Sequence, residues 1–176
     1  MSEVTLLMPS IFKQCDLSEN ADLSGFDCGV DDLNDFIQND ALKNQNDLVS
    51  VTKLLYLDAV LVGYFTITLG AIQKERIALT DKVDRYPYRV YPAIKLARLA
   101  VDKRYQKHGF GSELLYRFMI EAMNIVKIGS GRFISVDARA DAVGFYEKFG
   151  FVPALIKGNR EIVPLYLDIS RYYKSE

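Results

Sequence analysis

The residues best suited to do chemistry lie in one segment, between Leu99 and Ser112, which reads Leu-Ala-Val-Asp-Lys-Arg-Tyr-Gln-Lys-His-Gly-Phe-Gly-Ser. An apolar run ends there, a basic stretch follows, and two glycines come just before a long run of apolar residues at helical spacing. The start of a helix has backbone N–H groups without partners and carries partial positive charge, and glycine lets a phosphate approach the backbone closely. The segment therefore predicts an anion-binding turn. It is neither a Walker loop nor a Gly-x-Gly-x-x-Gly dinucleotide fingerprint.

A strand and a helix must position this turn. We predict a strand over residues 93–101 and a helix over residues 109–128. The helix is indicated by apolar residues that share one face, namely Phe110, Leu114, Leu115, Phe118, Ala122, Ile125 and Val126. Gly129 and Gly131 follow that run and end the helix.

Strands and helices alternate in the second half of the chain, which indicates an α/β sandwich with a mixed sheet. Residues 73–92 are basic, rich in tyrosine and irregular, so they predict a long and functional excursion. The other predicted elements are strands over residues 4–12, 49–57, 60–72, 133–136, 151–156 and 162–169, a hairpin turn near Asp58 and Ala59, and helices over residues 29–47 and 141–149.

The pattern Gln-x-x-Gly-x-Gly, from Gln106 to Gly111, resembles the acyl-CoA loop of the GNAT superfamily of N-acyltransferases. Two further segments carry the resemblance. Residues 95–102 look like the fourth strand of that family, and residues 142–151 look like its Ala-x-x-Phe-Tyr-x-x-x-Gly-Phe signature. The segments lie in the order and at the spacing of the family, and the resemblance covers roughly residues 25–170.

The resemblance implies an α/β fold of GNAT type, in which a central, mixed, mostly antiparallel twisted sheet is flanked by helices. It implies a single N-acetyltransferase domain over residues 1–176 that moves an acetyl group from acetyl-CoA, a co-substrate, to a primary amine by direct attack in a ternary complex. The backbone of Leu99, Ala100 and Val101 would pair with the pantetheine arm. The pyrophosphate would be held by the backbone N–H groups of Gln106, Lys107, His108, Gly109, Phe110, Gly111 and Ser112.

Two aromatic residues complete the implied site. Phe145 would pack beside the acetyl-CoA, and Tyr146 would face the thioester sulfur and assist the leaving thiolate. One departure stands out, because Arg139 occupies the position where many members have an asparagine that contacts pantetheine.

Acyl transfer to an amine needs a neutral amine, a stabilised oxyanion and a stabilised leaving thiolate. A strand N–H near Leu99 is the candidate for the oxyanion. For the base, the candidates are Asp102, Asp137 and Asp141, and none is singled out by its spacing. A carboxylate with a pKa near 4 is a weak base, so we expect amines of low pKa to be favoured as acceptors.

Composition bounds the class of protein. The chain has 176 residues, of which 49% are hydrophobic and 26% charged, so it is long enough for one globular domain and unlike a disordered chain or a disulfide-stapled miniprotein. Its net charge of −1 is unevenly placed: residues 1–60 have a balance of −8 and residues 73–107 a balance of +6. The basic segment indicates a localised anionic ligand.

Several classes of site and location are disfavoured. Two cysteines, Cys15 and Cys28, and one histidine, His108, make a Cys/His zinc site improbable, and we predict no metal. His108 reads as an exposed loop residue rather than a general base. No apolar run is long enough to span a bilayer and no signal peptide is recognisable, so we expect no membrane partner and a cytoplasmic location.

A more specific function than that of a general N-acetyltransferase is also open. Residues 26–29, with Leu33 and Phe36 beyond them, and residues 98–102 resemble GNAT-type toxins of toxin–antitoxin pairs. Those toxins acetylate the amino group of aminoacyl-tRNA and are silenced by a ribbon-helix-helix antitoxin, so tRNA and an antitoxin are implied as partners. The other alternative is a non-catalytic acyl-CoA-binding module. A homodimer through the C-terminal strands or the aromatic excursion is also compatible with the sequence.

Overall fold

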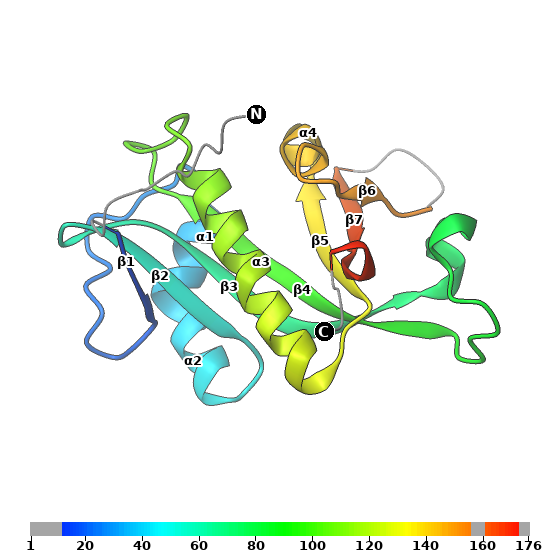
Figure 1. Cartoon of the computed structure of the whole chain (residues 1–176). Helices are drawn as coiled ribbons and strands as arrows, with labels where there is room; N and C mark the ends of the chain where they lie inside the picture. Colours follow the sequence, from blue (N-terminus) through cyan, green and yellow to red (C-terminus); the bar gives the residue numbers. More distant parts are fainter. Residues whose placement is uncertain (1–11, 156–160, 173–176) are drawn as a thin grey trace, which may run out of the picture. The chain divides into compact units, whose positions relative to one another are not determined.

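The computed structural model describes residues 12–155 and 161–172 (Figure 1). Its seven strands form one sheet in the order β1-β2-β3-β4-β5-β7-β6. The β4–β5 pair is parallel, and the pairs β1–β2, β5–β7 and β6–β7 are antiparallel, so the predicted mixed sheet is confirmed. The strands are β1 (Phe12–Asp16), β2 (Val51–Leu57), β3 (Val60–Gln73), β4 (Val90–Val101), β5 (Phe133–Arg139), β6 (Val152–Pro153) and β7 (Ile162–Asp168).

The predicted helices are present. The long helix is α3 (Phe110–Gly129), and the helix expected over residues 141–149 is a 3-10 turn, η4 (Ala140–Ala142), followed by α4 (Val143–Glu147). The helix expected over residues 29–47 contains a π-helical turn, η1 (Phe36–Asp40), between α1 (Asp31–Asp35) and α2 (Ala41–Asn46). Asp31 and Asp32 lie in the first turn of α1, where the helix dipole favours negative charge.

The structure adds one strand to those predicted and shortens the predicted excursion. The strand expected over residues 4–12 lies outside the described residues except for Phe12, and β1, which begins at that residue, was not predicted. It was missed because Phe12–Asp16 has no apolar alternation and is defined by antiparallel pairing with Lys53–Leu57 of β2. The excursion is also shorter than expected, because β3 extends to Gln73, β4 begins at Val90, and two 3-10 turns, η2 (Lys74–Arg76) and η3 (Leu79–Asp81), lie between them.

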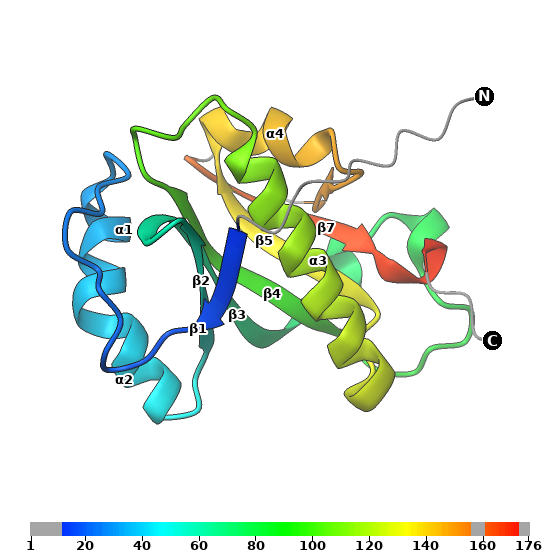
Figure 2. The ribbon, with the colours of Figure 1, turned by 60° about the vertical axis from the view of Figure 1, so that its left-hand side comes forward.

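The chain divides into two compact units, which are described separately: unit 1 is Met1–Thr66 with Arg98–Leu115, and unit 2 is Ile67–Ala97 with Tyr116–Glu176. In unit 1 the two faces of β3 differ. A side chain at Gly63 would collide with Leu114 of α3, whereas Tyr64, the next residue, packs against Phe26 and Phe36. Successive residues of a strand point to opposite faces, so the first turn of α3 covers one face in unit 1 and the α1–α2 segment the other (Figure 2).

The core of unit 2 is aromatic. Tyr91, Phe133 and Tyr166 are buried and pack edge to face, and Ile72 and Ile77 belong to the same cluster. The hydroxyl groups of the buried tyrosines accept hydrogen bonds from the backbone of the excursion. The Tyr91 hydroxyl accepts one from the Val83 N–H, and the Tyr166 hydroxyl accepts one from the Ala78 N–H. Unit 2 therefore fixes the excursion between β3 and β4 through its core.

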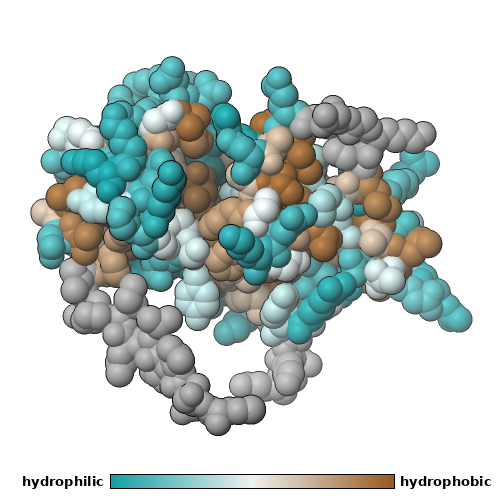
Figure 3. Space-filling view, turned by 90° about the horizontal axis from the view of Figure 1, so that it is seen from above, coloured by the Kyte–Doolittle hydropathy of each residue, from teal (hydrophilic) through white to brown (hydrophobic). Residues whose placement is uncertain are grey.

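Hydrophilic and apolar residues are interspersed on the face shown in Figure 3. None of the helices in the described part of the chain has the length and apolar character needed to cross a bilayer.

Candidate functional site

Asp102 anchors the predicted anion-binding turn in unit 1, directly after β4. Its fully buried carboxylate accepts hydrogen bonds from the backbone N–H groups of Asp27 (3.1 Å) and Arg104 (2.9 Å) and from the Arg104 guanidinium (2.8 and 2.9 Å). Its own N–H donates to the Val62 carbonyl (2.9 Å). Burial raises the pKa of Asp102, but the hydrogen bonds from Arg104 and Asp27 outweigh burial, so the pKa lies below its ordinary value. Asp102 is therefore a structural anion.

A second set of contacts holds the turn to residues 27–29. Lys103 forms an ion pair with Asp27 (2.5 Å), and this contact is the largest of those that lower the pKa of Asp27 to about 2. The side-chain amide of Gln106 donates to the carbonyls of Cys28 (2.8 Å) and Val101 (2.9 Å). The Gln106 side chain is thus a crosslink within the protein, and only the backbone of this residue is free to contact a phosphate.

The turn ends in the N-terminus of α3. The first backbone bond across the start of the helix runs from the Glu113 N–H to the Gly109 carbonyl (3.1 Å), so the N–H groups of Phe110, Gly111 and Ser112 precede it and have no helical acceptor. Gly109 has φ +89°, and a Cβ built on it would have nothing within 4 Å, so the backbone is open to a ligand there. Lys107 also lies in the left-handed region, with φ +64°.

Two basic side chains of the turn are paired with carboxylates, and a third is exposed and unpaired in the described residues. Lys103 and Arg104 are neutralised by Asp27 and Asp102, whereas Lys107 is exposed and has no ion-pair partner in the described residues. His108 is exposed, as expected. The turn thus presents helix amides and one unpaired lysine, which suits a phosphate anion. Pairing of β4 with β5 covers Ala93–Leu96 and stops before Leu99–Val101.

Tyr146 lies in unit 2, on α4, and only 7% of its surface is exposed. Its ring packs against Phe145 (5.0 Å between centroids) and Phe151 (5.7 Å). No described residue is hydrogen-bonded to its hydroxyl group, and burial raises its pKa to about 12. A buried phenol with an uncommitted hydroxyl suits a hydrogen-bond donor to a developing anion.

The backbone conformation of Gly150 shows why a glycine precedes Phe151 directly after α4. Its φ is +85°, and a Cβ there would lie 3.0 Å from the Tyr172 hydroxyl and 3.4 Å from Leu167. Glycine therefore lets the chain turn sharply after α4 and bury Phe151, which supports the ring of Tyr146. Arg139, at the position of the family's asparagine, is exposed and paired with Asp141 (3.3 Å).

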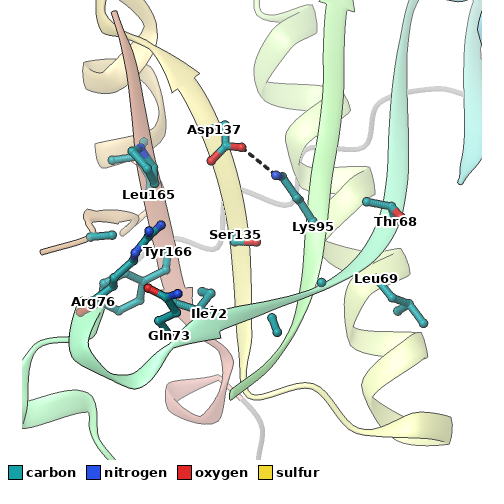
Figure 4. Close-up of a pocket in the computed structure, with 14 residues that line it drawn as sticks. Thr68, Leu69, Ile72, Gln73, Arg76, Lys95, Ser135, Asp137, Leu165 and Tyr166 are labelled. Carbon is teal, nitrogen blue, oxygen red and sulfur yellow. Dashed lines mark hydrogen bonds and ion pairs between the residues drawn. The ribbon is translucent and has the colours of Figure 1, made fainter. Parts of the chain in front are cut away.

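Unit 2 also contains a cavity of about 480 Å³ that the sequence did not predict (Figure 4). Lys95 of β4 and Asp137 of β5 form an ion pair (2.6 Å) in it, and Arg76 and Tyr166 line it as well. A signal was present in the sequence, because Lys95 and Asp137 are charged residues within largely apolar strands. Only the parallel register, in which Lys95 lies beside Ser135, brings them together.

None of the three candidate bases is a free carboxylate. Asp102 is buried and bonded to Arg104, Asp137 is paired with Lys95, and Asp141 is exposed and paired with Arg139. Among the residues that the structure describes, no cluster of three or more His, Cys, Asp or Glu side chains suits a metal ion. Unit 1 thus offers a helix start that suits a phosphate, and unit 2 offers a buried tyrosine and a charged cavity, whereas none of the three candidate carboxylates is a strong base.

Comparison with known proteins gives a consistent result. The chain is 29% identical over 136 residues to a tRNA-acetylating toxin of Mycobacterium tuberculosis (strain ATCC 25618 / H37Rv). The aligned residues make up 77% of this chain and 81% of the relative. The structure of AtaT complexed with acetyl-methionyl-tRNAfMet has a TM-score of 0.81 and 23% identity, covering 92% and 96% of the two chains. A tyrosine-to-phenylalanine mutant of AtaT bound to the C-terminus of the antitoxin AtaR and acetyl-CoA has a TM-score of 0.73 and 22% identity, covering 92% and 95%.

These structural likenesses confirm the predicted fold, and the resemblance drawn from the loop and the Phe-Tyr signature is confirmed by a family profile. The profile of the Acetyltransferase (GNAT) domain matches residues 59–153, which contain both segments and more than half of the chain. The protein is thus an acyl-CoA-dependent N-acetyltransferase that uses acetyl-CoA as co-substrate, and it belongs to the GNAT acetyltransferase domain family.

Proposed function

We propose that this acetyltransferase acts on the α-amino group of aminoacyl-tRNA, as a toxin held in check by an antitoxin. The observation that carries the proposal is the commitment of every candidate base to an ion pair. Removing a proton at pH 7 costs about 4–5 kcal/mol for a lysine amine, with a pKa near 10.4, but about 1 kcal/mol for an α-amine near 7.8. An enzyme without a strong base therefore favours an α-amine.

Two further observations support a nucleic-acid acceptor. Arg76, within the basic segment of the chain, lines the cavity of unit 2. The relative from M. tuberculosis acetylates tRNA, and AtaT is bound to acetyl-methionyl-tRNAfMet in its structure. An antitoxin partner is supported by the complex of AtaT with AtaR. We place this activity in the cytoplasm, where charged tRNA is found.

For the acetyl donor, we propose that the backbone of Leu99, Ala100 and Val101 pairs with the pantetheine arm, because these residues lie beyond the last pair of β4 with β5. The backbone N–H groups from Gln106 to Ser112 bind the pyrophosphate, with Lys107 as the nearest uncommitted charge. Phe145 packs beside the donor. We also propose that residues 1–176 form a single N-acetyltransferase domain.

The reaction follows from these roles. The neutral α-amine attacks the thioester carbonyl, a C–N bond forms, and the tetrahedral intermediate expels the thiolate of coenzyme A as the C–S bond breaks. The proton lost from the amine passes to solvent. Tyr146 stabilises the leaving thiolate by hydrogen bonding. Complete proton transfer from a phenol of pKa about 12 to a thiolate of pKa near 8.5 would cost about 5 kcal/mol, so the phenol keeps its proton.

The test is an acceptor comparison with purified protein and acetyl-CoA. Charged tRNA, a lysine-containing peptide with a blocked N-terminus, and an amino-acid ester are offered, and release of the free thiol is followed together with the N-acetylated product. We expect acetylated aminoacyl-tRNA as the main product and the peptide to be the poorest acceptor. Preference for the lysine peptide would refute the tRNA assignment. Acetyl-CoA binding without thiol release on any acceptor would instead favour a binding module.

A further inference from the structure

The excursion between β3 and β4, residues 74–89, carries one end of a row of aromatic rings. Tyr88 meets Tyr86 edge to face (5.4 Å between centroids), and Tyr86 stacks on Tyr91 (4.4 Å, 16° between planes). The row continues through Phe133 (5.2 Å) to Tyr166 (5.4 Å), which lines the cavity that holds Lys95 and Asp137. Rings buried in the core of unit 2 thus support the exposed ring of Tyr88 and reach the lining of the cavity.

The inner part of the excursion is fixed in place. Tyr86 donates a hydrogen bond from its hydroxyl group to the Val90 carbonyl (2.9 Å), and its own carbonyl accepts one from Lys74 Nζ (2.6 Å). The Tyr166 hydroxyl donates to Asp81 (2.9 Å), which is buried and also paired with Arg171. The rings are therefore held before any ligand arrives, which lowers the ordering cost of binding.

The outer end of the row is exposed and lies next to basic residues in the chain. Tyr88 has 66% of its surface exposed, although its neighbours Tyr86 and Tyr91 are packed. Arg89 is exposed and has no ion-pair partner in the described part of unit 2, and Arg85 has only a long contact (3.8 Å) with the equally exposed Asp84. An exposed ring on a fixed stack, flanked by arginines, offers a surface for a flat group that carries negative charge.

We propose that Tyr88 stacks on an unpaired base at the 3′ end of the acceptor tRNA, while Arg89 contacts the adjoining phosphate. This inference rests on the proposed function. Bases of single-stranded RNA stack on exposed aromatic rings and their backbone follows basic side chains, whereas the bases of a duplex are already stacked on each other. The excursion that carries Tyr88 also contributes Arg76 to the lining of the cavity, so the unpaired end that carries the aminoacyl group is the part of the tRNA that fits both.

The test compares the wild type with Tyr88→Ala and Tyr88→Phe. Two probes are used: an uncharged tRNA with its complete 3′ end, and the same tRNA lacking its last three nucleotides. We expect Tyr88→Ala to weaken binding of the complete tRNA by about 5- to 150-fold, which corresponds to about 1–3 kcal/mol for one stacked base. Tyr88→Phe keeps the ring and should bind within about twofold of the wild type. Tyr116→Ala, at a tyrosine that is 60% exposed on α3, is the matched control.

A second readout reports stacking directly. With 2-aminopurine in place of the 3′-terminal adenine, we expect the wild type and Tyr88→Phe to quench its fluorescence on binding, and Tyr88→Ala to leave it bright. Thermal melting shows whether each variant is folded, and the exposed position of Tyr88 predicts an unchanged transition.

The outcomes separate this inference from the function on which it rests. Wild-type protein that acetylates charged tRNA, together with Tyr88→Ala that binds the complete tRNA equally well, would refute the stacking role and leave the function intact. An equal loss of affinity for complete and trimmed tRNA would also refute it, because the contact would then be with the duplex. Wild-type protein that neither binds nor acetylates tRNA would refute both. Loss of binding to an antitoxin peptide, with tRNA binding unchanged, would assign Tyr88 to a protein interface.

Discussion

At the scale of single residues, burial determines what Tyr146 can do. Its ring is packed between Phe145 and Phe151, and burial raises its pKa to about 12, well above that of a thiol. A residue that holds its proton so firmly stabilises an anion by donating a hydrogen bond. Hydrogen bonds to charged groups contribute about 1.5–3 kcal/mol, which sets the size of the effect expected on removing the hydroxyl group.

The variant Tyr146→Phe removes that hydroxyl group and keeps the ring that packs in the core. We expect kcat to fall by about 10- to 150-fold, because only the leaving thiolate loses its donor. The affinity for acetyl-CoA should stay within about twofold of the wild type. Thiol release under saturating substrates measures the first quantity, and calorimetric titration with acetyl-CoA measures the second.

Tyr116→Phe is the matched control, since it removes a hydroxyl group from an exposed tyrosine of α3. It should leave both quantities unchanged. An unaltered kcat in Tyr146→Phe would show that its hydroxyl group has no part in the reaction.

At the scale of elements, the turn before α3 depends on the backbone conformation of Gly109. With φ +89° it occupies a region that other residues rarely adopt, and the amides that follow it are the ones available to a phosphate. Hydrogen bonds of the Asp102 and Gln106 side chains hold the rest of the turn in place. The turn is therefore held in shape by contacts within the protein itself.

We expect Gly109→Ala to cost about 1–2 kcal/mol of stability through backbone strain, because the new Cβ itself would meet no atom within 4 Å. Such a loss lowers Tm by about 2–8 °C in a chain of this size. If the strain shifts the neighbouring amides, acetyl-CoA affinity should fall by about tenfold or more while tRNA binding is retained. Thermal melting and calorimetry follow the two effects.

Gly129→Ala, at the other end of the same helix, is the control. A Cβ there also has open space, and the residue lacks the left-handed φ of Gly109. Normal acetyl-CoA affinity in a folded Gly109→Ala protein would contradict the assignment of this turn to the pyrophosphate.

At the scale of the whole molecule, a net charge of −1 conceals a strong asymmetry along the chain. Residues 1–60 have a net charge of −8, whereas residues 73–107 have a net charge of +6. A polyanionic acceptor is attracted by the basic segment, and salt screens such attraction over about 8–10 Å. The balance of the total chain, with a pI near 5.9, would by itself argue against a nucleic-acid ligand.

Salt should therefore separate a tRNA acceptor from a small one. If three phosphates are contacted, binding to tRNA weakens by about 40-fold when salt rises from 50 to 200 mM. We expect KM for charged tRNA to rise accordingly and KM for an amino-acid ester to change less than twofold. Initial rates at a fixed concentration of acetyl-CoA measure both. A parallel response of the two acceptors would contradict recognition through the phosphates.

The sequence by itself determined most of the elements and the family. The periodicity of residues 109–128 predicted α3, the glycines predicted the turn before it, and the helix expected over residues 141–149 contains α4. These features are local, because helical spacing and a positive φ are set by residues that are neighbours in the chain. The family profile confirms what they indicated.

Only the tertiary structure decided which charged residues are free. Asp102, Asp137 and Asp141 were equal candidates in the sequence, and their engagement by Arg104, Lys95 and Arg139 removes all three as free bases. The same is true of the row from Tyr88 to Tyr166, whose members come from the excursion, β4, β5 and β7. Contacts of this kind depend on strand order and register, which bring together residues far apart in the chain and leave no periodic signal in it.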